Sequence, residues 1–322
     1  MSVLTQALEG VKTAVILGHV HPDGDCFGAC VGLYNYLDTV YPQIETDLYL
    51  EEKVEKFSYM KHFDKIQTEK TDKVYDLCIC LDASDVERLG NFAGYLVSSA
   101  DSICLDHHIT NLGYARKNVV DPSASATCEV LYGQLEDEKI TKETAECLYT
   151  GIIHDTGVFK HSNTTSRTMA IAGKLMDKGI DFGSIIDGTF YRKTYVQNQI
   201  LGRALMESIR FLDGRCIVSV VRAKDMEFYG VTSKDLDGIV DQLRVTEGIE
   251  CAIFMYETGI HEFKISMRSN GCLDVSRIAQ YFGGGGHVKA AGCTMSGNLY
   301  DVVNNLSLHI EKQLESAPCI TE

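Results

Sequence analysis

The sequence lacks the features of a membrane or secreted protein. No apolar run approaches the roughly 20 residues that a membrane-spanning helix needs. The opening residues contain no basic region followed by an apolar stretch and a small-residue cleavage site, which is the pattern of a secretory signal. We therefore expect a cytoplasmic protein that has no membrane partner.

The sequence also lacks an excess of basic residues. It has 30 Lys and Arg against 45 Asp and Glu, which gives a formal net charge of −15. A protein that tracks a long nucleic acid usually carries a basic face, because its affinity comes from neutralising phosphates. The composition therefore argues against a long nucleic-acid track and favours short substrates. If those substrates bear phosphates, a local metal cluster would offset the repulsion.

A third absence concerns cysteine spacing. None of the twelve cysteines form a Cys-x-x-Cys pair, and most lie in apolar segments, such as Cys78 and Cys80 in LCICLD. This pattern favours reduced cysteines that pack in the core as small hydrophobic residues. A zinc or redox role is the alternative.

At 322 residues, the chain is long enough for two domains. Strand-like and helix-like segments alternate through residues 1–187, which predicts a doubly wound, mostly parallel α/β sheet with helices on both faces. A helical linker is expected over residues 188–211. Residues 212–322 then suggest a smaller α/β domain with a mixed or antiparallel sheet. The expected strands are 13–19, 47–52, 76–82 and 102–108 in the first domain, and 215–223, 251–257 and 262–269 in the second.

Acidic and histidine side chains follow several of the expected strands. Ligands of open α/β sheets bind beyond the carboxyl ends of the strands, so we expect these side chains to converge at one edge. An aspartate after a strand often only caps the next helix, and a lone histidine there is often structural. The combination of segments is what indicates a site. Its members are His19, Asp23, Asp25, Asp82, Asp106, His107, His108 and Asp155.

Clustered carboxylates repel one another unless protons or cations lie between them. Mixed oxygen and imidazole ligands suit Mn²⁺ or a related ion better than a thiolate site does. Two such ions about 3.5–4 Å apart can activate a water molecule and flank a phosphoryl group for in-line attack. The sequence therefore predicts a two-metal site.

A run of four glycines, residues 283–286, characterises the second domain. The run could be a flexible loop, but glycine also lets backbone N–H groups approach a phosphate closely. The segment from Phe263 to Gly292 is locally basic, and the planar guanidinium of Arg268 suits phosphate recognition. A solvated charge at a strand end is the alternative for Arg268. The predicted substrate-binding residues are Arg268, Gly284, Gly285, Gly286 and His287.

These motifs resemble the DHH superfamily of phosphoesterases, which includes RecJ-type exonucleases and family II inorganic pyrophosphatases. The second domain resembles the DHH-associated domain through FGGGGHVKAAG, residues 282–292. The resemblance covers nearly the whole chain. It is strongest with the nanoRNase type, which are bifunctional oligoribonucleases that also remove phosphate from 3'-phosphoadenosine 5'-phosphate.

The resemblance implies a role for each member of the metal set. One ion would be held by His19 and Asp23, and the other by Asp25 and His107. Asp82 would bridge the two ions. Asp155 would bind near the second ion.

The resemblance also implies two catalytic roles. Asp106 would orient His107 through its other ring nitrogen, and His108 would contact the scissile phosphate. Two positions depart from the family pattern. Ala29 stands where such families often carry serine, and His21 occupies a variable position and is not expected to bind metal.

We therefore expect an enzyme that uses two Mn²⁺ ions, with Mg²⁺ or Co²⁺ as alternatives. It would release 5'-mononucleotides from short oligonucleotides and convert 3'-phosphoadenosine 5'-phosphate to AMP. Cyclic or linear dinucleotides are alternative substrates. The acidic composition disfavours an exonuclease for long strands, the glycine-rich motif disfavours a pyrophosphatase, and the complete ligand set disfavours a non-catalytic nucleotide-binding regulator. A monomer and a homodimer both remain open.

Overall fold

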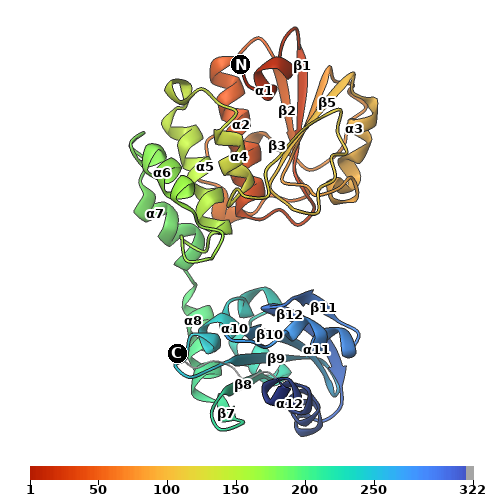
Figure 1. Ribbon diagram of the computed structural model, residues 1–322, viewed down its shortest axis with the longest axis vertical. Helices are drawn as coiled ribbons and strands as arrows, with labels where there is room; N and C mark the ends of the chain where they lie inside the picture. The colour runs from red at the N-terminus through yellow and green to blue at the C-terminus, as the bar shows by residue number, and fades with distance from the viewer. Residues whose placement is uncertain (317–322) are drawn as a thin grey trace. The chain divides into compact units, whose positions relative to one another are not determined.

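A computed structural model describes residues 1–316 of the chain. It forms two compact units, the first spanning Met1–Arg192 and the second beginning at Lys193 (Figure 1). The expected second domain extends to residue 322, and residues 317–322 lie outside the described part. No helix in the described part is long and apolar enough to cross a membrane.

The first unit contains a six-stranded sheet in the order β3-β2-β1-β4-β5-β6. Every neighbouring pair is parallel, so the prediction of a parallel α/β sheet is confirmed. The strand order reverses at β1, which pairs with β2 on one side and β4 on the other. Such a switch point is where open α/β sheets bind ligands. The strands are β1 (Thr13–Leu17), β2 (Glu45–Tyr49), β3 (Ile66–Gln67), β4 (Leu77–Leu81), β5 (Asp101–Asp106) and β6 (Lys117–Val120).

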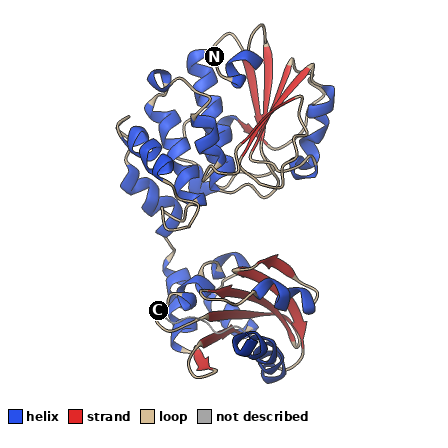
Figure 2. Cartoon of the chain, in the orientation of Figure 1, coloured by secondary structure: helices blue, strands red, loops and turns tan. Residues whose placement is uncertain are grey.

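Helices cover both faces of this sheet (Figure 2). Alternate strand residues point to opposite faces, so Ile16 packs in the core under α2, α4 and α5, whereas Val15 and Leu17 pack in the core on the α3 side. Ten cysteines of the described part, including Cys78 and Cys80, are buried free thiols, as expected. The helices are α1 (Val3–Ala7), α2 (Gly24–Val40), α3 (Ala93–Ser98), α4 (Thr127–Tyr132), α5 (Lys142–Asp155), α6 (Ser166–Met176) and α7 (Phe182–Ile186).

The second unit contains a six-stranded sheet in the order β11-β12-β10-β9-β8-β7. Only β8 and β9 are parallel, so the expected mixed sheet is confirmed. Helix α8, which the sequence analysis places in an interdomain linker, packs inside this unit and buries Ile200 and Ala204. The elements are α8 (Tyr195–Met206), β7 (Ile209–Phe211), β8 (Cys216–Val221), α9 (Ala223–Tyr229), α10 (Ile239–Arg244), β9 (Cys251–Gly259), β10 (Glu262–Ser269), α11 (Val275–Tyr281), β11 (Gly285–His287), β12 (Ala290–Ser296) and α12 (Leu299–Ser316).

Glycine allows α2 and α5 to pack closely in the first unit. A Cβ atom at Gly28 would lie 2.5 Å from the backbone oxygen of Cys147 and 2.9 Å from the backbone nitrogen of Gly151. No real Cβ fits at such distances from rigid backbone, so any other residue at position 28 would push the helices apart. This contact matters for the site, because α2 begins beside Asp25 and α5 ends at Asp155.

We expect Gly28→Ala to lower the free energy of unfolding by about 1–3 kcal/mol, because overpacking strains a close-packed interior. Gly173→Ala is the matched control, since Gly173 also lies in a helix and a Cβ there would meet nothing within 4 Å. That change should raise the free energy of unfolding by up to about 1 kcal/mol through helix propensity. Urea unfolding of both variants measures the difference. Equal stability of Gly28→Ala and the wild type would contradict the packing argument.

Candidate metal centre

The expected site residues converge at the carboxyl edge of the first sheet. His19 follows β1, Asp82 follows β4, and Asp106 ends β5. Asp25 and Asp155 arrive from the start of α2 and the end of α5. Carboxyl ends of neighbouring parallel strands meet at one edge, which explains why segments far apart in the sequence come together.

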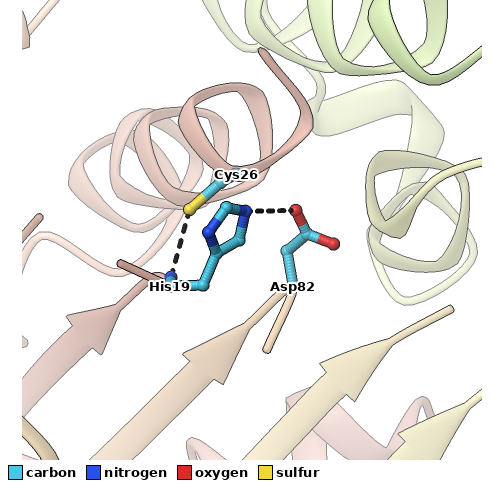
Figure 3. Close-up of side chains that lie close together, drawn as sticks. All are labelled: His19, Cys26 and Asp82. Atoms are coloured by element: carbon cyan, nitrogen blue, oxygen red, sulfur yellow. Dashed lines mark hydrogen bonds and ion pairs between the residues drawn. The ribbon is translucent and has the colours of Figure 1, made fainter. Parts of the chain in front are cut away.

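His19 and Asp82 form one side of the site (Figure 3). The Nδ1 atom of His19 donates to the backbone oxygen of Val20 at 2.7 Å, which leaves Nε2 facing the site. That Nε2 lies 3.4 Å from Asp82 Oδ2 and 3.7 Å from Asp23 Oδ1. Burial lowers the pKa of His19, but these two carboxylates outweigh it and raise the pKa to about 12.

Cys26 lies beside His19 and bonds the backbone of that residue. Its sulfur accepts a hydrogen bond from the backbone N–H of His19 at 3.3 Å (Figure 3). Burial raises the pKa of the Cys26 thiol well above its ordinary value, which disfavours the thiolate form that binds metal. This arrangement agrees with the expected structural role of the cysteines.

Asp25 is completely buried and is held by the beginning of α4. Its Oδ2 accepts the backbone N–H of Thr127 at 2.6 Å, and its Oδ1 accepts that of Cys128 at 3.0 Å. A Cβ at Gly151 would lie 2.5 Å from Oδ1, so glycine makes room for the carboxylate. Burial, followed by the charges of Asp82 and Asp155, raises the pKa of Asp25 well above its ordinary value.

Asp82 occupies the middle of the site. It adopts a left-handed backbone conformation with φ of 57°, which a non-glycine residue adopts only where surrounding contacts enforce it. Its Oδ1 accepts the hydroxyl of Thr127 at 2.9 Å and lies 3.8 Å from His107 Nε2. With His19 Nε2 near Oδ2, the two carboxylate oxygens face two different imidazoles.

His107 and Asp155 form the other side of the site. Their Nε2 and Oδ2 atoms lie 3.1 Å apart, and His107 Nδ1 lies 3.4 Å from the backbone oxygen of Ala124. Burial lowers the pKa of His107, but Asp155 and Asp25 outweigh it and raise the pKa to about 10. The neighbouring carboxylates therefore favour the protonated form of both His19 and His107.

The expected role of Asp106 is wrong in one respect. Its Oδ1 accepts Nδ1 of His108 at 2.7 Å, and it meets His107 only through the backbone N–H at 2.8 Å. The ring of His107 turns instead toward Ala124. Oδ2 of Asp106 accepts the side-chain amide of Asn111 at 2.7 Å. Asp106 therefore orients His108, and its bond raises the pKa of His108 above the ordinary value.

The donor set fits divalent cations. Three groups each have ligand atoms within 4.8 Å of one another, and oxygen and imidazole nitrogen dominate them. Buried carboxylates need nearby positive charge, which protons on two histidines supply in the metal-free site. Cations would replace these protons, because metal binding requires neutral histidine and ionised carboxylate. The groups are Asp82, His107 and His108; Asp25, His107 and Asp155; and His19, Cys26 and Asp82.

Two residues that position the site escaped sequence analysis. Thr127 is separated from its partner Asp82 by 45 residues, and no local pattern links them. Asn111 lies only five residues after Asp106, so its side-chain amide could have been identified from the sequence as a partner of Asp106. Both residues are buried, and each bonds an aspartate that the sequence motifs already include.

In the second unit, the structure places Arg268 and His287 in one row. His287 on β11 and Arg268 on β10 both pair with Ala290 on the intervening strand β12. Directly opposed residues of neighbouring antiparallel strands share a face, so these side chains lie on the same side of the sheet with only a methyl group between them.

The second half of the glycine run that precedes His287 is strand. Residues 285–287 form β11, and a Cβ at Gly284 would lie 2.2 Å from the backbone oxygen of Gly292. Gly286 has a φ of 140° and a Cβ there would lie 2.5 Å from the backbone oxygen of Ala290. Glycine is therefore required for strand contact at both positions. Of the expected binding residues, Gly285, Gly286 and His287 pair with β12, and Gly284 directly precedes them.

Comparison with known proteins agrees with this geometry. Residues 13–152 match the DHH family, N-terminal domain, and residues 213–316 match the DHHA1 domain. The chain is 28% identical over 309 residues to the bifunctional oligoribonuclease and PAP phosphatase NrnA of Thermus thermophilus, covering 92% of this chain and 89% of that protein. It is 26% identical over 298 residues to the NrnA protein of Bacillus subtilis, covering 91% and 92%.

A solved structure shares the fold of nearly the whole chain. The crystal structure of an exopolyphosphatase-related protein from Bacteroides fragilis has a TM-score of 0.85 and 25% sequence identity, and it covers 96% of this chain and 94% of that chain. The likeness extends over both units, as the two domain matches do. The chain therefore belongs to the DHH family of phosphoesterases, with a DHH domain that contains the candidate metal centre and a DHHA1 domain that follows it.

Proposed function

We propose that this protein uses two divalent cations to release 5'-mononucleotides from short oligonucleotides and to remove phosphate from 3'-phosphoadenosine 5'-phosphate. The observation that carries the proposal is the place of Asp82, which lies 3.4 Å from His19 Nε2 and 3.8 Å from His107 Nε2. One carboxylate between two sets of donors suits a pair of ions that share a ligand. The NrnA relatives from T. thermophilus and B. subtilis, which are named bifunctional oligoribonuclease and PAP phosphatase, suggest the substrate class.

The donor chemistry favours Mn²⁺, with Mg²⁺ and Co²⁺ as alternatives, because carboxylate oxygens and imidazoles are mixed in one set. When bound, the two cations would supply an activated water and neutralise charge that develops on the phosphoryl group. The proposed ligands are His19 and Asp23 for the first ion, Asp25, His107 and Asp155 for the second, and Asp82 for both.

His108 would hold the scissile phosphate. Its Nδ1 is engaged by Asp106, so Nε2 is the nitrogen available to a substrate. The bond to Asp106 raises the pKa of His108 and so favours the doubly protonated ring, in which Nε2–H can donate to a phosphate oxygen. By holding Nδ1, the buried carboxylate of Asp106 thus leaves Nε2 of His108 as the nitrogen that can bind an anion. Asp106 would act only through His108.

The row formed by Arg268, Ala290 and His287 would bind the part of the substrate that does not react. Arg268 Nε donates to Asp241 Oδ1 at 3.1 Å and Nη1 donates to the backbone oxygen of Met267 at 3.2 Å. These bonds orient the guanidinium and leave Nη2 for a ligand. The small Ala290 side chain leaves space between two groups that can donate to phosphate oxygens.

The test of the proposal is product analysis on a substrate panel. Purified protein with Mn²⁺ should convert oligonucleotides of two to about five residues to 5'-mononucleotides, and rates should fall on long strands because no basic track supports them. It should also convert 3'-phosphoadenosine 5'-phosphate to AMP.

Exhaustive chelation should abolish both activities and added Mn²⁺ should restore them. Undiminished turnover in the presence of chelator would contradict the two-ion proposal. Equal rates on short and long strands would indicate an exonuclease for long substrates.

Asp82→Asn should lower kcat by roughly 10³-fold or more, since a bridging ligand contributes several kcal/mol to charge stabilisation. Asparagine keeps the shape of the side chain and tolerates the left-handed backbone. His21→Asn is the matched control, because His21 also has a positive φ of 54° but its side chain is exposed and bonds Glu51. Its kcat should stay within about threefold of the wild type. Wild-type kcat for Asp82→Asn would disprove the assignment.

Arg268→Ala should lower kcat/KM on nucleotides about ten- to a hundredfold, the effect of losing a charge-assisted contact of about 1.5–3 kcal/mol. Hydrolysis of bis-p-nitrophenyl phosphate should be unchanged, because that substrate has no second phosphate to bind. Arg277→Ala, which removes an exposed arginine of the same domain, should leave both rates unchanged. If Arg268→Ala slowed both substrates equally, Arg268 would belong to the chemistry or the fold.

A further inference from the structure

Glu129 is a buried carboxylate that none of the proposed catalytic roles uses. It lies on α4, and its side chain has no exposed surface. Oε2 accepts the backbone N–H and the hydroxyl of Ser125 at 3.2 and 2.6 Å, together with the hydroxyl of Thr168 at 2.8 Å. Oε1 accepts Nε of Arg167, whose Nη2 also reaches Asp121 at 2.9 Å. Such a cluster of bonds fixes Ser125 against α6.

Ser125 belongs to the segment 124–128, which reaches two of the proposed metal ligands directly. The backbone N–H groups of Thr127 and Cys128 hold both oxygens of Asp25. The hydroxyl of Thr127 holds Oδ1 of Asp82. Both carboxylates are buried, so a shift of this segment would displace donors that hold them in place of water.

The same segment reaches the remaining ligands of the second ion. The backbone oxygen of Ala124 lies 3.4 Å from Nδ1 of His107. The side-chain amide of Asn163 donates to the backbone oxygens of both Ser125 at 3.0 Å and Asp155 at 3.2 Å. Every proposed ligand of the second ion is therefore in contact with the segment 124–128 or joined to it by one side chain.

The two ligands that serve only the first ion, His19 and Asp23, are held elsewhere. His19 is fixed by the backbone oxygen of Val20 and the sulfur of Cys26. Asp23 caps α2 by accepting the backbone N–H groups of Asp25 and Cys26 at 3.0 and 3.1 Å. None of these contacts involves the segment 124–128. Asp82, which both ions share, accepts the Thr127 hydroxyl through Oδ1, the oxygen nearer His107. The two halves of the centre therefore differ in what supports them.

We propose that Glu129 is a positioning residue for the second metal ion, acting through the segment 124–128. This inference rests on the proposed two-ion function. Groups that orient metal ligands typically change metal affinity about 10- to 100-fold when removed. Loss of the Glu129 carboxylate should therefore weaken binding of the second ion by about that factor and leave the first ion within about threefold.

Glu129→Gln tests the proposal with little change of shape. A glutamine has one oxygen and one NH₂ group where the carboxylate has two acceptors, so at least one donor from Ser125, Arg167 or Thr168 would face another donor. The measurement is calorimetric titration of the metal-free protein with Mn²⁺. We expect two binding events in the wild type, and in the variant an unchanged first event with a second weakened about 10- to 100-fold.

Asp47→Asn is the matched control for lost stability. Asp47 on β2 also accepts several side-chain bonds, from Lys73 at 2.6 Å, Tyr75 at 2.7 Å and Gln67 at 3.0 Å, but contacts no ligand of the centre. Asp47→Asn should lower the melting temperature and leave the affinities for the first and the second metal ion unchanged. Ser125→Ala, which removes only the hydroxyl, provides a smaller perturbation in the expected direction if Glu129→Gln does not fold.

Each outcome decides a different question. Selective weakening of the second ion in Glu129→Gln supports the proposal. Wild-type affinity for both ions, or equal weakening of both, overturns it, since the first excludes positioning and the second indicates a general structural effect. A single binding event in the wild type would instead overturn the two-ion function itself.

Discussion

Asp25 and Asp82 lie in the protein interior, at the point where the strand order of the parallel sheet reverses. Removing a carboxylate from water costs several kcal/mol unless positive charge or hydrogen-bond donors replace the solvent. The first domain supplies such groups from all sides, through protonated His19 and His107 and through the start of α4. This need for positive charge makes the cluster a candidate site for divalent cations, because a cation satisfies several carboxylates at once. The left-handed backbone of Asp82 is one cost of gathering them.

The helical packing of the first domain follows from the same requirement. Asp25 lies in the first turn of α2 and Asp155 ends α5, so the distance between them depends on how closely these helices approach. Gly28 and Gly151 leave out the side chains that would separate the helices, and Gly151 also leaves space for the Asp25 carboxylate. Glycines that look unremarkable in a helical sequence thus determine the geometry of the centre. Helix propensity opposes glycine at such positions, which shows that close approach outweighs it.

The sequence predicted the parallel sheet and the convergence of the metal set, because both follow from local patterns: alternating elements and polar residues at strand ends. It did not predict the partner of Asp106, since the choice between the rings of His107 and His108 depends on where Ala124 lies in the folded chain. The sequence analysis read the glycine run 283–286 as a flexible loop or a phosphate-binding segment, and it did not predict that residues 285–287 pair with β12. Thr168 and Glu129 lie 39 residues apart, a separation at which no periodicity indicates a bond. Supporting contacts are therefore the part of a site that sequence conveys least.

The charge of the chain also bears on the proposed substrate. With a net charge of −15, a phosphate far from any cation meets a predominantly acidic surface. At physiological ionic strength, screening confines the benefit of a bound ion to about 8 Å. A phosphate at the metal centre gains from this field, and one beside Arg268 and His287 gains from local donors, but the further phosphates of a long strand gain from neither. Each added nucleotide then loses conformational freedom on binding and gains no favourable electrostatic interaction. On this argument, the proposed preference for short substrates would arise because positive charge is absent beyond these two places, and no steric barrier would be needed to explain it.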